Sequence, residues 1–152
     1  MGGEGPRQRG VARAAPRRAR ITVGKKGREK AAQLFAEAAG LLPPGDIATR
    51  WRYIKEGADA EQTMGDERGN NAALVQAIAN YRAALLLAAR MERPLDWAMT
   101  QNNLGIALWR LGERESGTAK LEEAVVAFRE ALKERTRERV PLDWAFGPEQ
   151  SG

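Results

Sequence analysis

The pentapeptide PLDWA occupies residues 94–98 and returns unchanged at residues 141–145, 47 positions later. The same offset aligns residues 65–85 with residues 112–132, where Leu74 matches Leu121 and most other matches pair similar side chains. Self-similarity at a fixed period is typical of repeat proteins, whose stacked units form a scaffold for partner binding. We therefore predict a repeat protein.

The composition narrows the chemistry that this chain can perform. The 152 residues leave room for one domain, and they include no cysteine and no histidine. This composition excludes disulfides, thiolate and imidazole metal ligands, cysteine nucleophiles and histidine-based acid–base catalysis. A site made of carboxylates alone stays open, but no acidic pair stands out from the helix charges. We predict a non-enzymatic protein without a cofactor or a bound metal.

The positive charge is concentrated at the N-terminus. Residues 1–30 carry ten Lys and Arg against two Glu, a net charge of +8, whereas the remaining 122 residues carry 15 basic and 18 acidic groups, a net charge of −3. A solvated, disordered tail, or sequence upstream of the natural start, explains this composition most simply. The alternative is a tether to nucleic acid or another acidic surface. We expect no nucleic-acid binding outside this tail.

Hydropathy argues against a membrane location. No apolar run approaches the roughly 18–20 residues that a membrane span needs. The basic N-terminal segment lacks the apolar core of a secretory signal. The absence of cysteine is compatible with a reducing compartment. We predict a cytoplasmic protein that has no membrane partner.

Apolar residues recur at helical spacing along most of the chain, and nothing reads as a strand. We predict an all-α fold. The predicted helices span residues 27–42, residues 46–64 with Asp46 or Thr49 as the cap, and residues 71–91. Two more follow: one has Asp96 in its first turn and runs to about residue 111, and the last spans residues 118–137. The breaks between them are a proline pair at residues 43–44, two loops at residues 65–70 and 112–117, and the Arg93-Pro94 step.

A small/large pattern marks the best-formed pair of helices. Gly105 and Ala124 allow the two helices to approach, while Leu108 and Phe128 fill the space between them. With this pattern the chain resembles the tetratricopeptide repeat family, in particular its long-period bacterial arrays and kinesin-light-chain-like relatives. Residues 94–145 match almost throughout, and residues 65–90 match the second half of the unit.

The resemblance implies antiparallel helical hairpins stacked as a short right-handed solenoid. The implied organisation is a basic tail (1–25), a short N-terminal helix with a proline-rich break (26–45), a degenerate first hairpin (46–93), a well-formed hairpin (94–140) and the truncated start of a third repeat (141–152).

In the family, the first helix of each hairpin lines a concave groove that binds peptides. Carried over to this chain, the groove positions are Met99, Asn102, Asn103, Ile106, Trp109 and Arg110. An asparagine amide both donates and accepts hydrogen bonds, and therefore suits a peptide backbone. Alternatively, one asparagine bridges neighbouring helices and Trp109 packs against the adjacent repeat. The first hairpin carries instead Lys55, Glu56, Asp59 and Gln62, which makes a groove there doubtful.

Three further expectations follow. Trp97 and Trp144 recur in register, which favours packing at repeat junctions. The Glu/Arg-rich residues 130–139 read as a solvated helix face. Phe146-Gly147-Pro148 departs from the family pattern, so we expect a fragment, a truncated reading frame or a decayed gene copy. The face of the last helix that bears Leu121, Val125 and Leu132 should then lack part of its cover, which favours self-association.

The sequence predicts a protein–protein interaction scaffold that binds a peptide or protein segment in the groove. The alternatives are nucleic-acid binding through the tail and an inactive fragment of a longer tetratricopeptide protein.

Overall fold

The computed structural model describes residues 25–90 and 92–138, and within these ranges every regular element is helical. The all-α prediction is confirmed. The predicted tail and third repeat lie almost wholly outside the described residues. The elements are α2 (Lys25–Leu41), α3 (Ile47–Arg68), α4 (Asn71–Leu87), α5 (Pro94–Gly112), α6 (Ala119–Leu132) and a short π-helical continuation, η1 (Lys133–Glu138).

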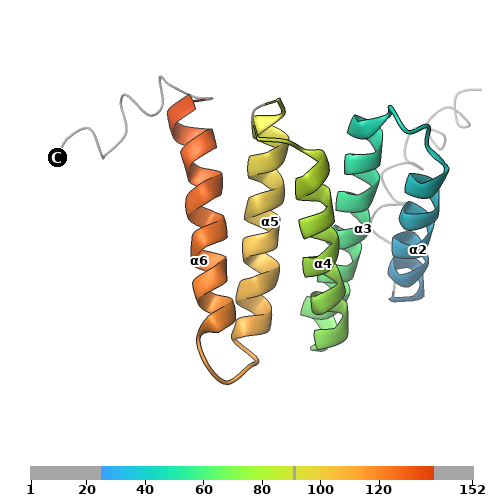
Figure 1. Cartoon of the computed structure of the whole chain (residues 1–152). Helices are drawn as coiled ribbons and strands as arrows, with labels where there is room; N and C mark the ends of the chain where they lie inside the picture. The colour runs from blue at the N-terminus through green and yellow to red at the C-terminus, as the bar shows by residue number, and fades with distance from the viewer. Residues whose placement is uncertain (1–24, 91, 139–152) are drawn as a thin grey trace, which may run out of the picture.

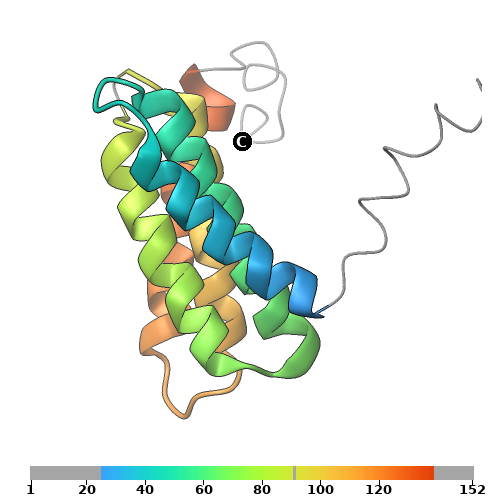
Figure 2. The same cartoon turned by 90° about the vertical axis from the view of Figure 1, so that its right-hand side faces the viewer.

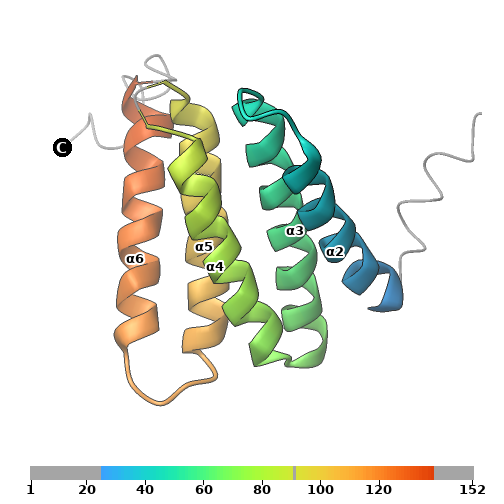
Figure 3. The ribbon, with the colours of Figure 1, turned by 45° about the vertical axis from the view of Figure 1, so that its right-hand side comes forward.

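The helices stand side by side in chain order (Figure 1). Each packs on its neighbour in sequence, and α3 also contacts α5. The connections alternate between the two ends of the row, so that successive helices are antiparallel (Figure 3). Seen along the row, α2 lies nearest the viewer and crosses the helices behind it obliquely (Figure 2). Over the described part of the chain, none of these helices has the length and apolar character needed to cross a membrane.

The first hairpin turns at Gly69, and the predicted loop over residues 65–70 is wrong. Helix α3 continues through Gly65 to Arg68, and Gly69 ends it with a left-handed backbone (φ 64°) that glycine adopts without strain. Gly65 serves packing instead, because a methyl group there would lie 2.5 Å from Leu74 Cγ. The sequence alone does not distinguish a glycine that makes a turn from a glycine that lets a neighbouring helix approach.

Short polar side chains cap α3 and α4. Asp46 Oδ1 accepts a hydrogen bond from the Thr49 amide at 3.3 Å, so Asp46, one of the two predicted residues, is the cap. Asn70 Oδ1 accepts from the Ala73 amide at 3.2 Å and begins α4. Each cap satisfies an amide that the helix leaves without an internal partner.

Helix α4 is shorter than predicted. It ends at Leu87, although Ala88 and Ala89 favour helix, and the amides of Glu92 and Arg93 close a turn on the Ala89 carbonyl. Tertiary packing overrides the local preference here, because Ala88 is fully buried in a cluster with Trp51 and Ala84. The next helix begins at Pro94 and has Asp96 in its first turn, as predicted, with proline in that turn where no amide is needed.

One helix contact recurs in space at the 47-residue offset. A methyl group at position 112 would lie 2.7 Å from Leu121 Cδ2, the equivalent of the Gly65–Leu74 approach. In the second hairpin a methyl group at Gly105 would lie 2.7 Å from Phe128 Cε1, as the small/large pattern predicts. The main core joins both hairpins, and its fully buried large side chains are Tyr81, Leu74, Leu108 and Leu111. Burying each such aliphatic side chain contributes about 1.5–3 kcal/mol.

A second cluster joins the hairpins at the opposite end of α3. It contains Trp51, Ala84 and Ala88, and Trp97 packs against it. The predicted packing role at a repeat junction therefore fits Trp97, whereas Trp144 lies outside the described residues. On α6, Val125 and Leu132 are exposed, but Leu121 is partly buried against Gly112. The face is therefore covered in part, as expected: Gly112 lets α5 approach Leu121, while Val125 and Leu132 stay exposed.

Candidate peptide-binding groove

Contacts on three sides orient α5 and leave one stripe of it open. Gly105 and Gly112 face α6, and Leu104 and Leu108 are buried in the core that includes α4 residues. Thr100 and Asn103 face α3, where their side chains bond Trp51 and Asp59. The residues of the remaining face, here called the open stripe, are exposed or partly buried and follow one another at three- and four-residue spacing. They are Leu95, Met99, Asn102, Ile106 and Trp109.

Four of the six predicted groove residues lie on this open stripe. Met99 is 47% exposed and Trp109 is 40% exposed, while Asn102 and Ile106 are partly buried. Apolar side chains exposed in line along one helix are a feature of interaction surfaces.

The other two, Asn103 and Arg110, turn toward α3. Asn103 Nδ2 donates to Asp59 Oδ1 at 3.1 Å, which matches the alternative that one asparagine bridges neighbouring helices. The Arg110 guanidinium lies 4.6 Å above the Trp109 ring, and its Nε is 3.5 Å from Asp66 Oδ1. The Trp109 ring therefore packs against the side chain of Arg110, the next residue in sequence, and not in the protein core.

Asp59 is the centre of a polar network that joins three helices. The sequence did not predict this network. Besides Asn103 of α5, it accepts from the Tyr81 hydroxyl of α4 at 2.5 Å and pairs with Lys55 of α3 at 2.6 Å. Burial raises the pKa of the Tyr81 phenol well above its usual range, and the Asp59 carboxylate raises it further. The phenol therefore stays protonated and serves as a hydrogen-bond donor.

The only sequence signal for this network was the i,i+4 spacing of Lys55 and Asp59. That spacing occurs on many solvated helices, whereas Lys55 is only 9% exposed. The residues that made a first-hairpin groove doubtful thus fix α4 and α5 against α3.

A cavity of about 310 Å³ lies at one end of the open stripe, between α5 and η1. Its lining residues are Leu95, Met99, Asn102 and Arg135. The Asn102 amide forms no hydrogen bond with any other residue in the part of the chain described. Two apolar side chains, the Asn102 amide and a guanidinium therefore share one opening.

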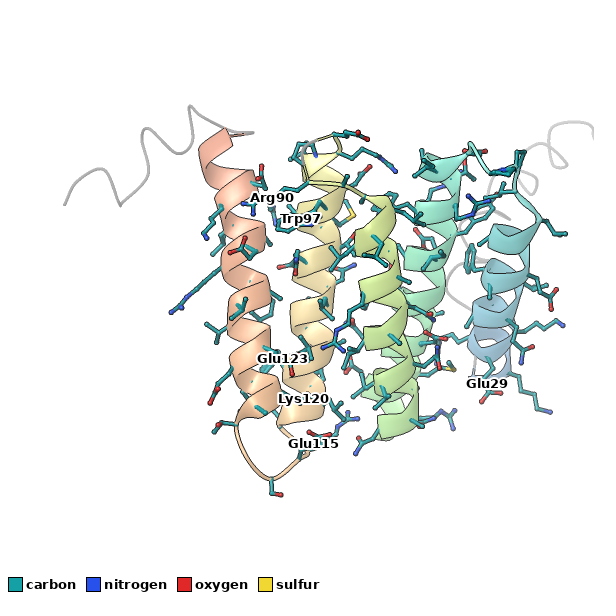
Figure 4. The ribbon with its side chains drawn as sticks, in the orientation of Figure 1. Glu29, Arg90, Trp97, Glu115, Lys120 and Glu123 are labelled. Atoms are coloured by element: carbon teal, nitrogen blue, oxygen red, sulfur yellow. The ribbon has the colours of Figure 1, made fainter. Side chains whose placement is uncertain are left out.

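Arg90 lies at the same end of the molecule as this cavity (Figure 4). Its guanidinium lies 4.5 Å above the Trp97 ring, its Nε donates to Glu134 Oε1 at 2.6 Å, and its NH1 donates to Glu130 Oε2 at 2.8 Å. The hydrogen bond to Glu134 raises the pKa of Arg90. Lys133, which donates to Glu130 at 2.9 Å, lowers the pKa of that carboxyl, and Arg90 lowers it further.

Glu134 corrects the expectation of a solvated helix face over residues 130–139. It is 3% exposed, and its Oε2 is buried without a hydrogen-bond partner among the described residues. The burial depends on Arg90, which is 44 positions away. Local charge patterning does not reveal such a partner.

Comparison with known proteins identified no match for this chain among family models, curated proteins or solved structures.

Proposed function

We propose that this protein is a non-catalytic, tetratricopeptide-like scaffold that binds a peptide or protein segment along the open stripe of α5. In this proposal the hairpins α3–α4 and α5–α6 are two repeats of a right-handed solenoid. Their first helices, α3 and α5, form the inner layer. The recurrence of the Gly65–Leu74 contact as Gly112–Leu121 supports the assignment of repeats.

The Asn102 amide, which has no hydrogen-bond partner among the described residues, carries the proposal. It is partly buried, lies between Met99 and Ile106 on the stripe, and borders a cavity. An amide in this position can donate to a peptide carbonyl and accept from a peptide N–H. Apolar side chains on both sides of it supply area for a ligand side chain, and Trp109 extends that area along the helix.

The binding test begins with selection of peptides from a displayed random library on the full chain. Affinities of the selected peptides are then measured by fluorescence anisotropy. Asn102→Ala is expected to weaken binding about 2- to 10-fold, as the loss of one or two neutral hydrogen bonds predicts. The matched control is Gln76→Ala, which removes an exposed amide from α4 and should leave affinity unchanged. Equal affinity of Asn102→Ala and the parent chain would contradict the proposal.

Salt dependence separates this function from binding through the basic tail. Attraction of residues 1–30 to a polyanion should fall steeply as salt rises, because counterion release drives it. Binding in the groove should change little over the same range. Loss of all peptide binding at moderate salt would favour the tail.

A further inference from the structure

The first and last long helices of the row each have a neighbour on one side only (Figure 1). Among the described elements, α2 contacts α3 alone, and α6 contacts α5 and its own continuation η1. Both helices run in the same direction, because successive helices alternate (Figure 3). When two copies are placed end to end, α6 of one copy therefore lies beside α2 of the next and parallel to it.

Each of these two helices carries a stripe of exposed residues in which charged and apolar side chains alternate. The α2 stripe consists of Lys30, Leu34, Glu37 and Leu41. The α6 stripe consists of Glu122, Val125, Arg129 and Leu132. Residues three and four positions apart share one side of a helix, and each stripe is about 15 Å long. The four apolar side chains are between 46% and 86% exposed.

The charges of the two stripes are complementary. In a parallel pair of helices Lys30 can lie opposite Glu122, and seven residues later Glu37 can lie opposite Arg129. Because the spacing of seven is the same in both helices, the two ion pairs can form in one register. None of the four takes part in an ion pair within the described residues, where Glu122 accepts a hydrogen bond from Thr118 Oγ1 at 2.7 Å.

The shape of the α2 face favours α6 as its partner. A cavity of about 370 Å³ opens beside the α2 stripe, and its lining residues are Ala31, Leu34, Phe35, Ala38 and Tyr53. Helix α6 presents two adjacent valines, Val125 and Val126, which are 46% and 57% exposed. An antiparallel pair of α6 helices would also match Glu122 with Arg129, but it would leave this apolar cavity in water. The end-to-end arrangement covers both faces.

We propose that this chain self-associates end to end, with the α6 stripe of one copy docked on the α2 stripe and the adjoining cavity of the next. The two surfaces differ, so the contact is heterologous and each added copy presents a new open end. Helix α2 is then the surface that receives the last helix. The association does not depend on peptide binding by α5.

Sedimentation equilibrium of the full chain tests this arrangement. The weight-average mass of the parent chain should rise beyond that of a dimer as concentration approaches about 1 mM, where a weak contact is populated. Leu34→Asp blocks the α2 stripe and Val125→Asp blocks the α6 stripe, so each variant alone should be monomeric. An equimolar mixture should form a heterodimer and nothing larger, because one intact α2 stripe and one intact α6 stripe remain.

Val75→Asp is the matched control for Val125→Asp. Val75 is 54% exposed on α4, which lies inside the row and has neighbours on both sides. This variant should associate like the parent chain. Circular dichroism checks that every variant keeps its helical content.

Charge reversal gives a second measurement that leaves the apolar side chains in place. Lys30→Glu together with Glu37→Lys should weaken association about 3- to 30-fold, because two attractions become repulsions. Adding Glu122→Lys and Arg129→Glu to the same chain should restore it. A chain with all four changes that associates no better than the chain with two overturns the proposal.

Three sedimentation results also overturn it. A parent chain that stays monomeric would show that no second copy covers these faces. Association of Leu34→Asp alone would show a contact between two α6 helices. An equimolar mixture without a heterodimer would show that the two stripes do not bind each other. Because no peptide enters these experiments, their outcome is independent of the proposed function.

Discussion

Trp51 and Thr100 join two helices across 49 positions of sequence: the Trp51 indole N–H donates to Thr100 Oγ1 at 3.0 Å in the protein interior. Thr100 is fully buried and also donates to the Asp96 carbonyl at 2.8 Å. This hydrogen bond fixes the height of α5 relative to α3, and hence of the open stripe relative to the first hairpin.

Removal of Thr100 should leave the buried Trp51 indole N–H unsatisfied, and removal of Trp51 should take the indole donor from Thr100 Oγ1, which keeps its bond to the Asp96 carbonyl. Trp51→Phe and Thr100→Val are each expected to lower the free energy of unfolding by about 1–3 kcal/mol. The double variant should lose less than the sum, by about 1 kcal/mol, because the second change no longer breaks the bond. Urea denaturation followed by circular dichroism measures all four states. Strict additivity would show that the hydrogen bond contributes nothing to stability.

Substitution of two helical glycines should have opposite effects. Gly105→Ala places a methyl group 2.7 Å from Phe128 Cε1, and the forced displacement of the ring should cost about 1–3 kcal/mol. Gly40→Ala meets nothing within 4 Å near the end of α2 and should stabilise the protein by up to about 1 kcal/mol through helix propensity. Thermal unfolding compares the two, and combining Gly105→Ala with Phe128→Leu should restore part of the loss.

The two carboxylates beside Lys55 should differ strongly in importance. Asp59→Ala removes the acceptor of Tyr81 and Asn103 and the close partner of a buried ammonium, so we expect a loss of about 2 kcal/mol or more. Glu56, 3.7 Å from the same ammonium, has a largely exposed side chain, and Glu56→Ala should cost about 0–1 kcal/mol. Urea denaturation of both variants checks the difference, and similar losses would argue against the network.

Glu61 should make stability depend on pH. Burial raises its pKa, an effect that the hydrogen bond from Asn80 partly offsets. A raised carboxyl pKa in the folded state gives stability that is present below the unfolded pKa of about 4.3 and is lost as pH rises through the folded value. Glu61→Gln does not titrate and can still accept from Asn80. Its unfolding free energy should therefore exceed that of the parent chain at pH 7 and approach it near pH 4. A constant difference across this range would contradict the assignment.

The hairpins could be predicted from local sequence because their determinants lie close together in it. The Gly105–Phe128 contact follows from helical spacing and from the sizes of the two side chains. The cap at Asp46 and the proline in the first turn of α5 are likewise local. These signals place helices in the right order, with boundaries that err by a few residues.

The determinants that could not be predicted join residues far apart in the chain. Asp59 and Glu134 each read as one charge among many on a helix, and only Asn103, Tyr81 and Arg90 from other helices make them structural. Gly65 read as a turn because the Leu74 side chain that approaches it belongs to the next helix. For the site, the sequence predicted the stripe of α5 and left open whether one asparagine bridges neighbouring helices, but it did not say that Asn103 would be the one bound to Asp59.

The arrangement of the helices as a row, with each packed on its sequence neighbours, has a mechanical consequence. Most contacts close only short loops, so the entropy lost in forming any one of them is small and assembly can proceed hairpin by hairpin. Under a pulling force the row should unfold from its ends, one hairpin at a time. The Trp51–Thr100 bond and the Asp59 network would then strengthen the junction between the hairpins, because both connect α3 to α5.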